Sequence, residues 1–150
     1  MTVVSVEGIV ERPPEVVFDF VARHHFENHP RWDPDLVEMS QTSRGPVGIG
    51  TTARVVRRQG RRRVEGTATV HAYEPDRFAA WDVRFGAFRL DQRAELVPER
   101  GGTATRLRLC IDTTAHGPLR VILPLLRPRF RKTMTQSLRT IAALLEDEQR

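Results

Sequence analysis

Cysteine and long apolar runs are scarce in this sequence. Cys110 is the only cysteine among 150 residues, so no disulfide can form within the chain, and we expect an inert small side chain there. No apolar run approaches the roughly 18 residues that cross a bilayer. Residues 1–4 lack the charged and apolar regions of a secretion signal. These absences favour a cytoplasmic protein and predict no stable membrane insertion.

Lysine is almost absent, and arginine carries the basic charge. The net charge is +5, and Lys132 is the only lysine among 24 basic residues. A basic balance can indicate nucleic acid or an anionic surface as a partner. The arginines are spread over the whole chain, which favours the composition of a GC-rich genome as their origin. They also lack the interleaved aromatics of a single-strand platform, so we expect no nucleic-acid partner.

What is present is the composition of one globular domain covering residues 1–150, with 39% hydrophobic and 29% charged residues. Residues 2–11 predict a first strand, which ends at Pro13 and Pro14. Two short helices follow at residues 16–21 and 24–29, the second ending at Pro30. Residues 36–41 predict a second strand, and residues 44–50 form a loop.

Residues 51–112 predict a five-stranded antiparallel meander with one dry face. Its turns set which residues lie opposite each other, and paired residues share a face. A one-residue slip would turn every side chain over. The expected pairs, which with Ile111 form the dry face, are Ala53–Gly66, Val55–Val64, Ala68–Val83, Val70–Trp81, Ala72–Ala79, Phe85–Phe88, Val83–Leu90, Leu96–Thr105, Ala94–Leu107 and Gln92–Leu109. Because this face mixes small residues with a few aromatics, we expect a hollow beneath any lid.

The C-terminal part predicts a long amphipathic helix. Prolines at 118, 124 and 128 predict a broken approach over residues 118–127, followed by a regular helix to about residue 147. Apolar residues recur at steps of three and four, at Leu126, Phe130, Met134, Leu138, Ile141 and Leu145. We therefore predict an α+β fold: a curled antiparallel seven-stranded sheet wrapped around a long C-terminal helix, with two short helices between strands 1 and 2.

Five short motifs stand at the expected element boundaries: PPEVVF at 13–18, NHPRW at 28–32, GIGT at 48–51, EP at 74–75 and GTATR at 102–106. With this element order, essentially the whole chain resembles the START-like superfamily, also called SRPBCC or helix-grip. The resemblance is to its polyketide cyclase/dehydrase-like branch. It implies a deep cavity between sheet and last helix that holds apolar or amphipathic small molecules. Some members are cyclases, aromatases or hydrolases and others only bind and carry, so the fold does not settle the activity.

The cavity wall is expected from the dry face, the long helix and the short-helix region. Each of these residues has core packing as its alternative role, but apolar pockets with a few polar anchors are typical of small-molecule sites. The candidate ligand-binding residues are Phe26, Trp32, Trp81, Phe85, Phe88, Gln92, Leu107, Leu109, Phe130, Met134 and Leu138.

Gln92 is the sharpest candidate because it is the only amide on the dry face. A buried amide without a partner costs about 1–3 kcal/mol. Its side chain therefore either bonds a ligand or water, or bonds the Trp81 indole or a bulged strand.

The histidines at 24, 25 and 29 include an i,i+4 pair, a spacing that can hold a metal. No carboxylate follows His25 at the expected place, so we predict a polar, partly exposed helix, no metal and no cofactor. The sequence shows no Gly-x-Ser-x-Gly motif and no phosphate loop, and it assigns no catalytic residue.

Two groups of arginines leave alternatives open. Arg57 and Arg62 are expected to share the dry side at a hairpin tip, either as guides for an anionic ligand or as part of a solvated hairpin. A second basic group surrounds the start of the long helix beside apolar residues. Contact with a membrane surface and simple lid packing both explain it, and lid packing is the simpler explanation.

The sequence therefore predicts binding of a hydrophobic or aromatic small molecule between the sheet and the C-terminal helix. The alternative is a polyketide cyclase/aromatase or dehydratase-like lyase acting on a polyketide-like substrate in the same cavity. Such chemistry needs groups that move protons next to a carbonyl. Apart from Gln92, the expected dry face offers little, so Asp33, Asp35 or the mouth arginines would have to supply it. The sequence leaves open whether the chain is an enzyme, and whether it is a monomer or a homodimer.

Overall fold

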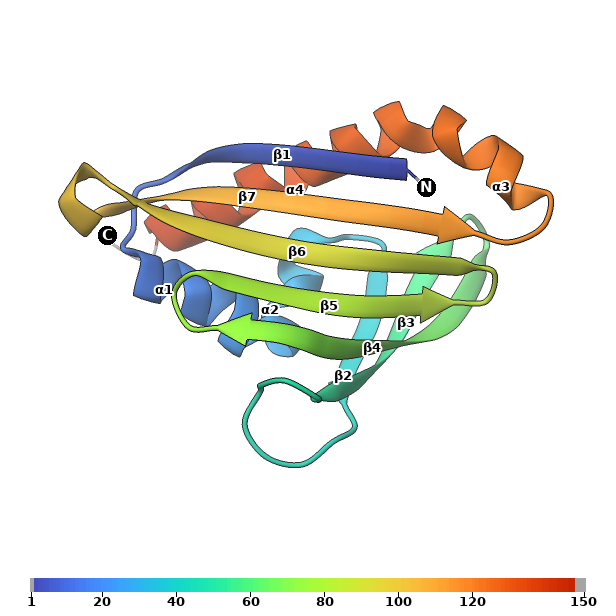
Figure 1. The fold of residues 1–150 in the computed structure, drawn as a ribbon, viewed down its shortest axis with the longest axis horizontal. Coiled ribbons are helices and arrows are strands. Elements are labelled where there is room, and N and C mark those ends of the chain that lie inside the picture. The colour runs from blue at the N-terminus through green and yellow to red at the C-terminus, as the bar shows by residue number, and fades with distance from the viewer. Residues whose placement is uncertain (1, 148–150) are drawn as a thin grey trace.

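The structure, a computed structural model, describes residues 2–147. These residues form one antiparallel sheet with helices on one of its faces (Figure 1). The strands are β1 (Thr2–Val10), β2 (Leu36–Gln41), β3 (Thr52–Gln59), β4 (Arg62–Glu74), β5 (Phe78–Phe85), β6 (Phe88–Glu99) and β7 (Ala104–Ala115). The helical segments are α1 (Pro14–Phe18), η1 (Asp19–Arg23), α2 (His25–Trp32), η2 (Arg100–Gly102), α3 (Leu119–Ile122), η3 (Leu123–Leu126) and α4 (Arg127–Asp147).

The sheet has the order β1-β7-β6-β5-β4-β3-β2 and contains seven strands. Its two edges are held by different helices, since α4 packs against β1 and α2 packs against β2. The helices α2 and α4 also contact each other, and Ser137 of α4 donates a hydrogen bond to the carbonyl of Trp32 at 3.2 Å. The sheet therefore curls around the helical layer, as the sequence predicts.

The core lies under the half of the sheet that α1, η1 and α2 cover. Pro14 occupies the first position of α1, where its missing N–H costs nothing. Valines and phenylalanines from α1 and η1 share one buried cluster with the small residues of β3, β4 and β5. Ala53, Ala68 and Ala79 are therefore covered by the short helices and do not line a hollow.

In two hairpins the predicted register keeps the right faces but is wrong by two residues. Val55 pairs with Gly66 rather than Val64, because Gly60, whose φ is +62°, takes the first of the two central positions of the turn. The β6–β7 loop is also longer than expected, so Gln92 pairs with Ile111 rather than Leu109. A shift by two keeps every side chain on its face.

The pairs of β5 with β6 and the first part of the β4–β5 ladder are confirmed. Phe85 pairs with Phe88, and Val70 pairs with Trp81. A register shift between Val70 and Ala72 then sets Tyr73 opposite Ala79. The prediction that pairs Ala72 with Ala79 is therefore wrong, because a bulge adds one residue and reverses the alternation. The ring of Tyr73 packs edge-on against Phe18, with centroids 5.2 Å apart.

The helices confirm the predicted plan and change some boundaries. α2 continues to Trp32 with Pro30 inside it, and the Asp33 amide still donates to the His29 carbonyl at 3.1 Å. The helix therefore loses a hydrogen bond at Pro30 without ending there. The approach to α4 is broken into α3 and η3, as predicted, and Met134, Leu138, Ile141 and Leu145 form its buried stripe. No helix within residues 2–147 is long and apolar enough to span a bilayer.

Candidate functional site

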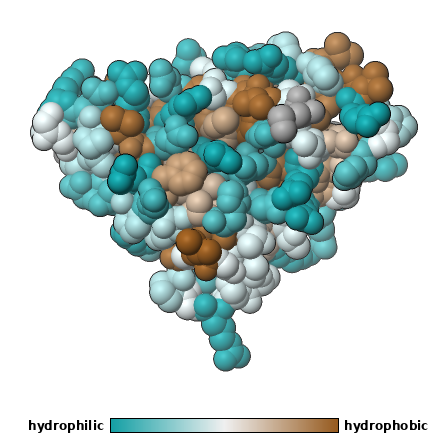
Figure 2. Space-filling model, in the orientation of Figure 1, coloured by the Kyte–Doolittle hydropathy of each residue, from teal (hydrophilic) through white to brown (hydrophobic). Residues whose placement is uncertain are grey.

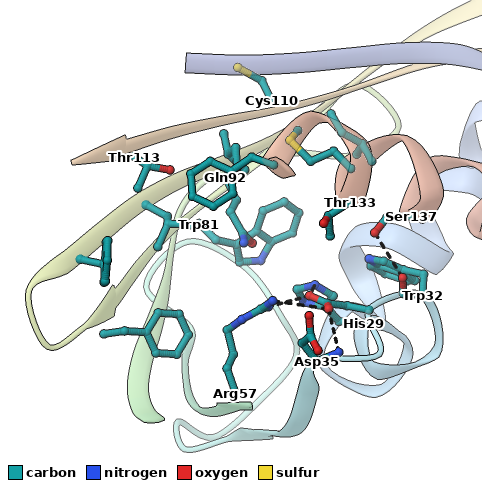
Figure 3. Close-up of a pocket in the computed structure, with 18 of the residues that line it drawn as sticks. His29, Trp32, Asp35, Arg57, Trp81, Gln92, Cys110, Thr113, Thr133 and Ser137 are labelled. Carbon is teal, nitrogen blue, oxygen red and sulfur yellow. Dashed lines mark hydrogen bonds and ion pairs between the residues drawn. The ribbon is translucent and has the colours of Figure 1, made fainter. Parts of the chain in front are cut away.

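A cavity of about 490 Å³ lies between the concave face of the sheet and α4. Strands β5, β6 and β7 form its floor, while α2 and the end of β3 close one side (Figure 3). Leu90, Gln92, Leu109 and Ile111 point to this concave face and are only half-buried, although residues of the same face on β5 are fully buried. The hollow expected from the sequence is therefore present, but over β6 and β7.

Most of the predicted ligand-binding residues reach this cavity. Trp32, Trp81, Phe85, Phe88, Gln92, Leu109, Phe130 and Met134 line it. The structure does not bring Phe26, Leu107 and Leu138 to the lining. All three are buried in the core, and Leu138 instead packs over Gly8 of β1. Leu138 is excluded by the face of α4 on which it lies, since Ser137 and Ile141 on either side of it in the sequence do line the cavity.

Gln92 occupies the middle of the floor. It lies on β6 between Trp81 of β5 and Ile111 of β7, and Figure 3 shows it beside the Trp81 indole within the group of side chains that line the cavity. Among the described residues the structure gives its amide no side-chain hydrogen bond. The amide is therefore available to a bound molecule.

Four aromatic rings form a stacked wall beside Gln92. The imidazole of His25 stacks on Trp81 with centroids 4.2 Å apart and planes at 22°. His29 lies 4.7 Å from His25 and stacks on Trp32 at 5.2 Å. All four residues are buried. The expectation of a partly exposed polar helix is therefore wrong for His25 and His29, because α2 turns this face toward β5.

His25 is held in its neutral form. Its Nδ1 lies 2.8 Å from the carbonyl of Val21, and since a carbonyl only accepts, Nδ1 carries the proton. Burial, and next the charge of His29, lower the pKa of His25 well below its usual value. Neutral His25 therefore keeps an acceptor lone pair on Nε2.

Asp33 joins α2 to the β3–β4 hairpin at the entrance to the cavity. Its Oδ2 accepts from Nη1 of Arg57 at 2.6 Å and lies 3.5 Å from Nε2 of His29, and its Oδ1 accepts from the Asp35 amide at 3.2 Å. Burial alone would raise the pKa of Asp33, but the hydrogen bond from His29 and the charge of Arg57 outweigh it and hold that pKa well below its usual range. The dashed lines of Figure 3 show this junction.

Several buried polar atoms at the cavity wall have no partner among the described residues. They are Nε2 of His25, Nδ1 of His29, Nε1 of Trp81 and Oγ1 of Thr113. An unsatisfied buried polar atom costs about 1–3 kcal/mol, and such atoms in folded proteins call for a specific explanation. The four atoms belong to residues that line the cavity, but protein atoms cover the polar atoms themselves.

Sequence reasoning missed His25 and His29 as wall residues and gave a place at the cavity mouth as one of two alternatives for Arg57. The histidines could have been identified from their spacing, because they share one face of a helix with Phe26 and Trp32. Such a shared apolar face marks a buried stripe. Arg57 lines the cavity on the dry side of β3, as expected, whereas Arg62 is exposed and lies outside the lining.

Two other expectations concern reactive groups. Within residues 2–147, no cluster of three or more His, Cys, Asp or Glu side chains could hold a metal ion. Cys110 alternates with Leu109 and Ile111 on β7, so it belongs to the opposite face, as expected. Burial raises the pKa of the Cys110 thiol despite the nearby Arg108 and Arg93, which disfavours a reactive thiolate.

Comparisons with known proteins agree with this architecture. The Zhui aromatase/cyclase from Streptomyces sp. R1128 superposes with a TM-score of 0.79 at 14% identity, covering 99% of this chain and 96% of that chain. A protein from Thermus thermophilus gives 0.77 at 16% identity, covering 99% and 100%. A START superfamily protein from Mycobacterium smegmatis gives 0.69 at 20% identity, covering 97% and 95%. At these identities the likeness shows the fold alone.

The sequence comparisons reach the family level. No curated protein matches the sequence significantly. The family described as "Polyketide cyclase / dehydrase and lipid transport" matches residues 1–146. With its curled seven-stranded sheet gripping a long C-terminal helix, the chain belongs to this family.

Proposed function

We propose that this protein binds a hydrophobic or aromatic small molecule in the cavity between β5–β7 and α4. The observation that carries the proposal is the half-exposed apolar floor of β6 and β7 beside a wall of stacked rings. The fold leaves this surface open while it buries the rest of the concave face. The family description, which names both cyclases and lipid transport, is consistent with such a ligand. We further propose that residues 1–150 act as one domain and that this domain works in the cytoplasm.

The polar group at the floor of the cavity defines what the ligand carries. The half-buried Gln92 amide both donates and accepts, whereas protein atoms cover Nε1 of Trp81 and Nε2 of His25. A hydroxyl or enol group on an aromatic or polyketide-like skeleton matches the amide, because it donates and accepts at one oxygen. A purely aliphatic molecule would leave the amide unsatisfied.

The test is a comparison of melting temperatures with 2-naphthol and with naphthalene, which lacks the hydroxyl. At about 100 times the dissociation constant, 2-naphthol should raise the melting temperature by about 5–10 °C. Leu109→Trp should abolish the shift by filling the cavity, and Ile49→Trp, at an exposed loop position, should not. Gln92→Leu should weaken 2-naphthol binding about three- to tenfold and leave naphthalene unchanged. A shift that survives Leu109→Trp would place the site elsewhere.

The second candidate is a cyclase or dehydratase activity in the same cavity. It is favoured by the contact of His29 with Asp33, because Asp33 orients the ring and Nδ1 of His29 has no partner among the described residues. Protein atoms cover Nδ1, so this activity requires the ring to move toward the cavity. A base in this position could remove a proton from a carbon next to a carbonyl, and Arg57 would stabilise the Asp33 carboxylate. The residues that the sequence left as possible suppliers, Asp33 and the mouth arginine Arg57, thus flank a histidine.

This activity is tested with a poly-β-ketone analogue followed by product chromatography. His29→Asn should reduce kcat by about 100-fold or more if the imidazole moves the proton, with little change in ligand-induced melting shift. Gln92→Leu should raise KM instead. An unchanged rate in His29→Asn would remove this residue from the chemistry, and an absence of product from the wild-type protein would leave binding as the function.

A further inference from the structure

The arginines on the outer face of the sheet form ion pairs with acidic residues of the same face. Arg54 pairs with Glu38 and Glu65, Arg84 and Arg89 pair with Asp82, and further pairs join Arg93 to Asp91, Arg106 to Glu99 and Arg108 to Glu95. The ladder of alternating charge leaves little net field on this face. The net charge of +5 must therefore reside elsewhere.

The unpaired cations gather at one end of the molecule. Successive turns of an antiparallel sheet alternate between its two ends, so the β3–β4 hairpin, the β5–β6 turn and the β7–α3 connection share an end (Figure 1). Residues 113–145 contain six basic and no acidic residues. Because the whole chain carries a net charge of +5, the remaining residues are together nearly neutral. The exposed cations of this end that form no ion pair with a described residue are Arg58, Arg61, Arg62, Arg63, Arg120, Arg127, Arg129, Arg131 and Lys132.

The same end exposes large apolar side chains. Val121 is 75% exposed, Leu125 is 77% exposed and Ile122 is 47% exposed. Leu123 of the same segment is buried, so the packing of a lid accounts for Leu123 and not for its neighbours. Figure 2 shows hydrophobic surface next to hydrophilic surface at the corner where Figure 1 places α3. The simpler explanation from the sequence, lid packing alone, is therefore insufficient.

This end also contains the mouth of the cavity. Arg58 and Gly60 of the hairpin line the cavity from one side, and Leu126 and Arg129 line it from the other. The apolar tip of α3 and η3 directly precedes Leu126 in the chain. A surface that covered α3 and η3 would thus lie next to the entrance through which a ligand passes.

We propose that this end of the molecule docks on an anionic lipid bilayer surface, with Val121, Ile122 and Leu125 inserted among the headgroups. Two unlike features, exposed apolar side chains and a surrounding ring of unpaired cations, are combined in segments that lie on acidic membranes. A nucleic acid would use the cations and leave the apolar tip in water, so the bilayer fits both features. The proposal goes beyond ligand binding in the cavity and does not depend on it.

The test is co-sedimentation of the full chain with vesicles of phosphatidylcholine alone and with 30% phosphatidylglycerol. Binding should require the anionic lipid and should weaken as salt rises. Val121→Asp with Leu125→Asp should reduce binding by about tenfold or more, because each charge would enter the interface. Arg120→Glu with Arg127→Glu should reduce it by about 25-fold or more, at about fivefold per cation. Neither pair lines the cavity, so ligand-induced melting shifts should not change.

Matched variants elsewhere on the surface provide the controls. Ile49 is 72% exposed and Val97 is 52% exposed, both outside this end. Arg44 and Arg77 are exposed cations with no ion pair among the described residues, and Arg77 lies at the opposite end of β4 from the hairpin. Ile49→Asp with Val97→Asp, and Arg44→Glu with Arg77→Glu, should leave vesicle binding within about twofold.

Three outcomes would overturn the proposal. The first is that the control pairs reduce vesicle binding as much as the Val121/Leu125 and Arg120/Arg127 pairs do. That result would mean that net charge alone drives the binding. The second is binding that persists in Val121→Asp with Leu125→Asp. The third is no vesicle binding together with a dimer, measured by light scattering, that Leu125→Asp dissociates. That result would assign the apolar tip to self-association.

Discussion

Asp33 is the residue on which the entrance of the site depends. Its carboxylate is buried, accepts hydrogen bonds from Arg57 and from the Asp35 amide, and contacts His29. A carboxylate removed from water in this way is stable only while its partners remain. The junction therefore links α2 to the β3–β4 hairpin.

We predict that Asp33→Asn lowers the free energy of unfolding by about 2–3 kcal/mol, because it leaves Arg57 half-buried without its counter-charge. Urea denaturation at pH 7 measures the change. Asp35→Asn is the control, since the Asp35 side chain is exposed and only its backbone amide contacts Asp33. Equal losses in both variants would show that the ion pair is not the source of the stability.

His25 should make the stability pH-dependent near neutrality. Its pKa is lowered in the folded protein, so below the unfolded value of about 6.5 the unfolded chain binds more protons than the folded one. The stabilisation is thus complete above that pH and falls as pH decreases, by at most about 1.4 kcal/mol per pH unit for one proton. Denaturation curves from pH 7.5 to 5.5 should show this slope, and His25→Phe should flatten it. A slope that is unchanged in His25→Phe would assign it to another group. Asp33 would act only at lower pH, because its lowered pKa makes its stabilisation disappear in acid.

For single residues, the sequence predicted a role where a side chain differed clearly in polarity from its neighbours. Gln92 stood out as an amide among apolar residues on a strand whose alternation was clear. His25 and His29 did not stand out, because histidine occurs both on protein surfaces and at buried positions. Only the packing of α2 against β5 separated the two alternatives.

At the scale of elements, Gly66 shows how tightly β4 and β5 are packed. A Cβ added there would collide with the carbonyl oxygen of Arg84 and would lie 2.6 Å from the Phe85 ring. The neighbouring oxygen belongs to the backbone of an adjacent strand, so it cannot move aside alone. The pairing of β4 with β5 therefore requires a residue without a side chain at Gly66, and this glycine does not create a cavity.

We predict that Gly66→Ala lowers the free energy of unfolding by about 2 kcal/mol or more, through displacement of β5. Gly48→Ala is the matched control, because a Cβ at Gly48 meets nothing within 4 Å and its φ is negative or extended. Thermal unfolding followed by circular dichroism compares them. A loss in Gly66→Ala no larger than in Gly48→Ala would contradict the crowding seen between the strands.

Sequence periodicity identified the elements better than the connections between them. The stripe on α4 and the alternation along β5 and β6 follow from local geometry, so both were correct. The hairpin register was wrong by two where Gly60 takes a different turn position. A turn is decided by a few backbone angles, which a hydrophobic pattern does not report.

At the scale of the whole molecule, the position of the hollow follows from how the helices divide the sheet. The short helices cover one end of the concave face and α4 packs along β1, so the parts of β6 and β7 around Gln92 and Ile111 remain uncovered between them. Of the small residues that suggested a cavity, Ala53, Ala68 and Ala79 are buried in the core, and Ala94 lines the cavity. The expectation of a cavity was correct, although its reason was wrong.

This division predicts opposite responses to added volume. Ala68→Phe should destabilise the protein by about 1–3 kcal/mol, since Ala68 is fully buried in the core. Leu109→Phe should change stability by less than about 1 kcal/mol, since its side chain extends into empty space. Chemical denaturation of both variants measures the difference. Similar losses would mean that the floor of β6 and β7 is packed and that no cavity exists in solution.

The sequence alone determined the order of the elements, the faces of the strands, the apolar stripe of α4 and the family, because each depends on residues close together in the chain or on a pattern repeated along it. The tertiary structure decided which part of the concave face stays open, brought His29, Asp33 and Arg57 together, and separated paired arginines from unpaired ones. These features depend on distances between segments far apart in sequence. Such distances are set by the curl of the sheet and by the helices that cover it, which no single segment encodes.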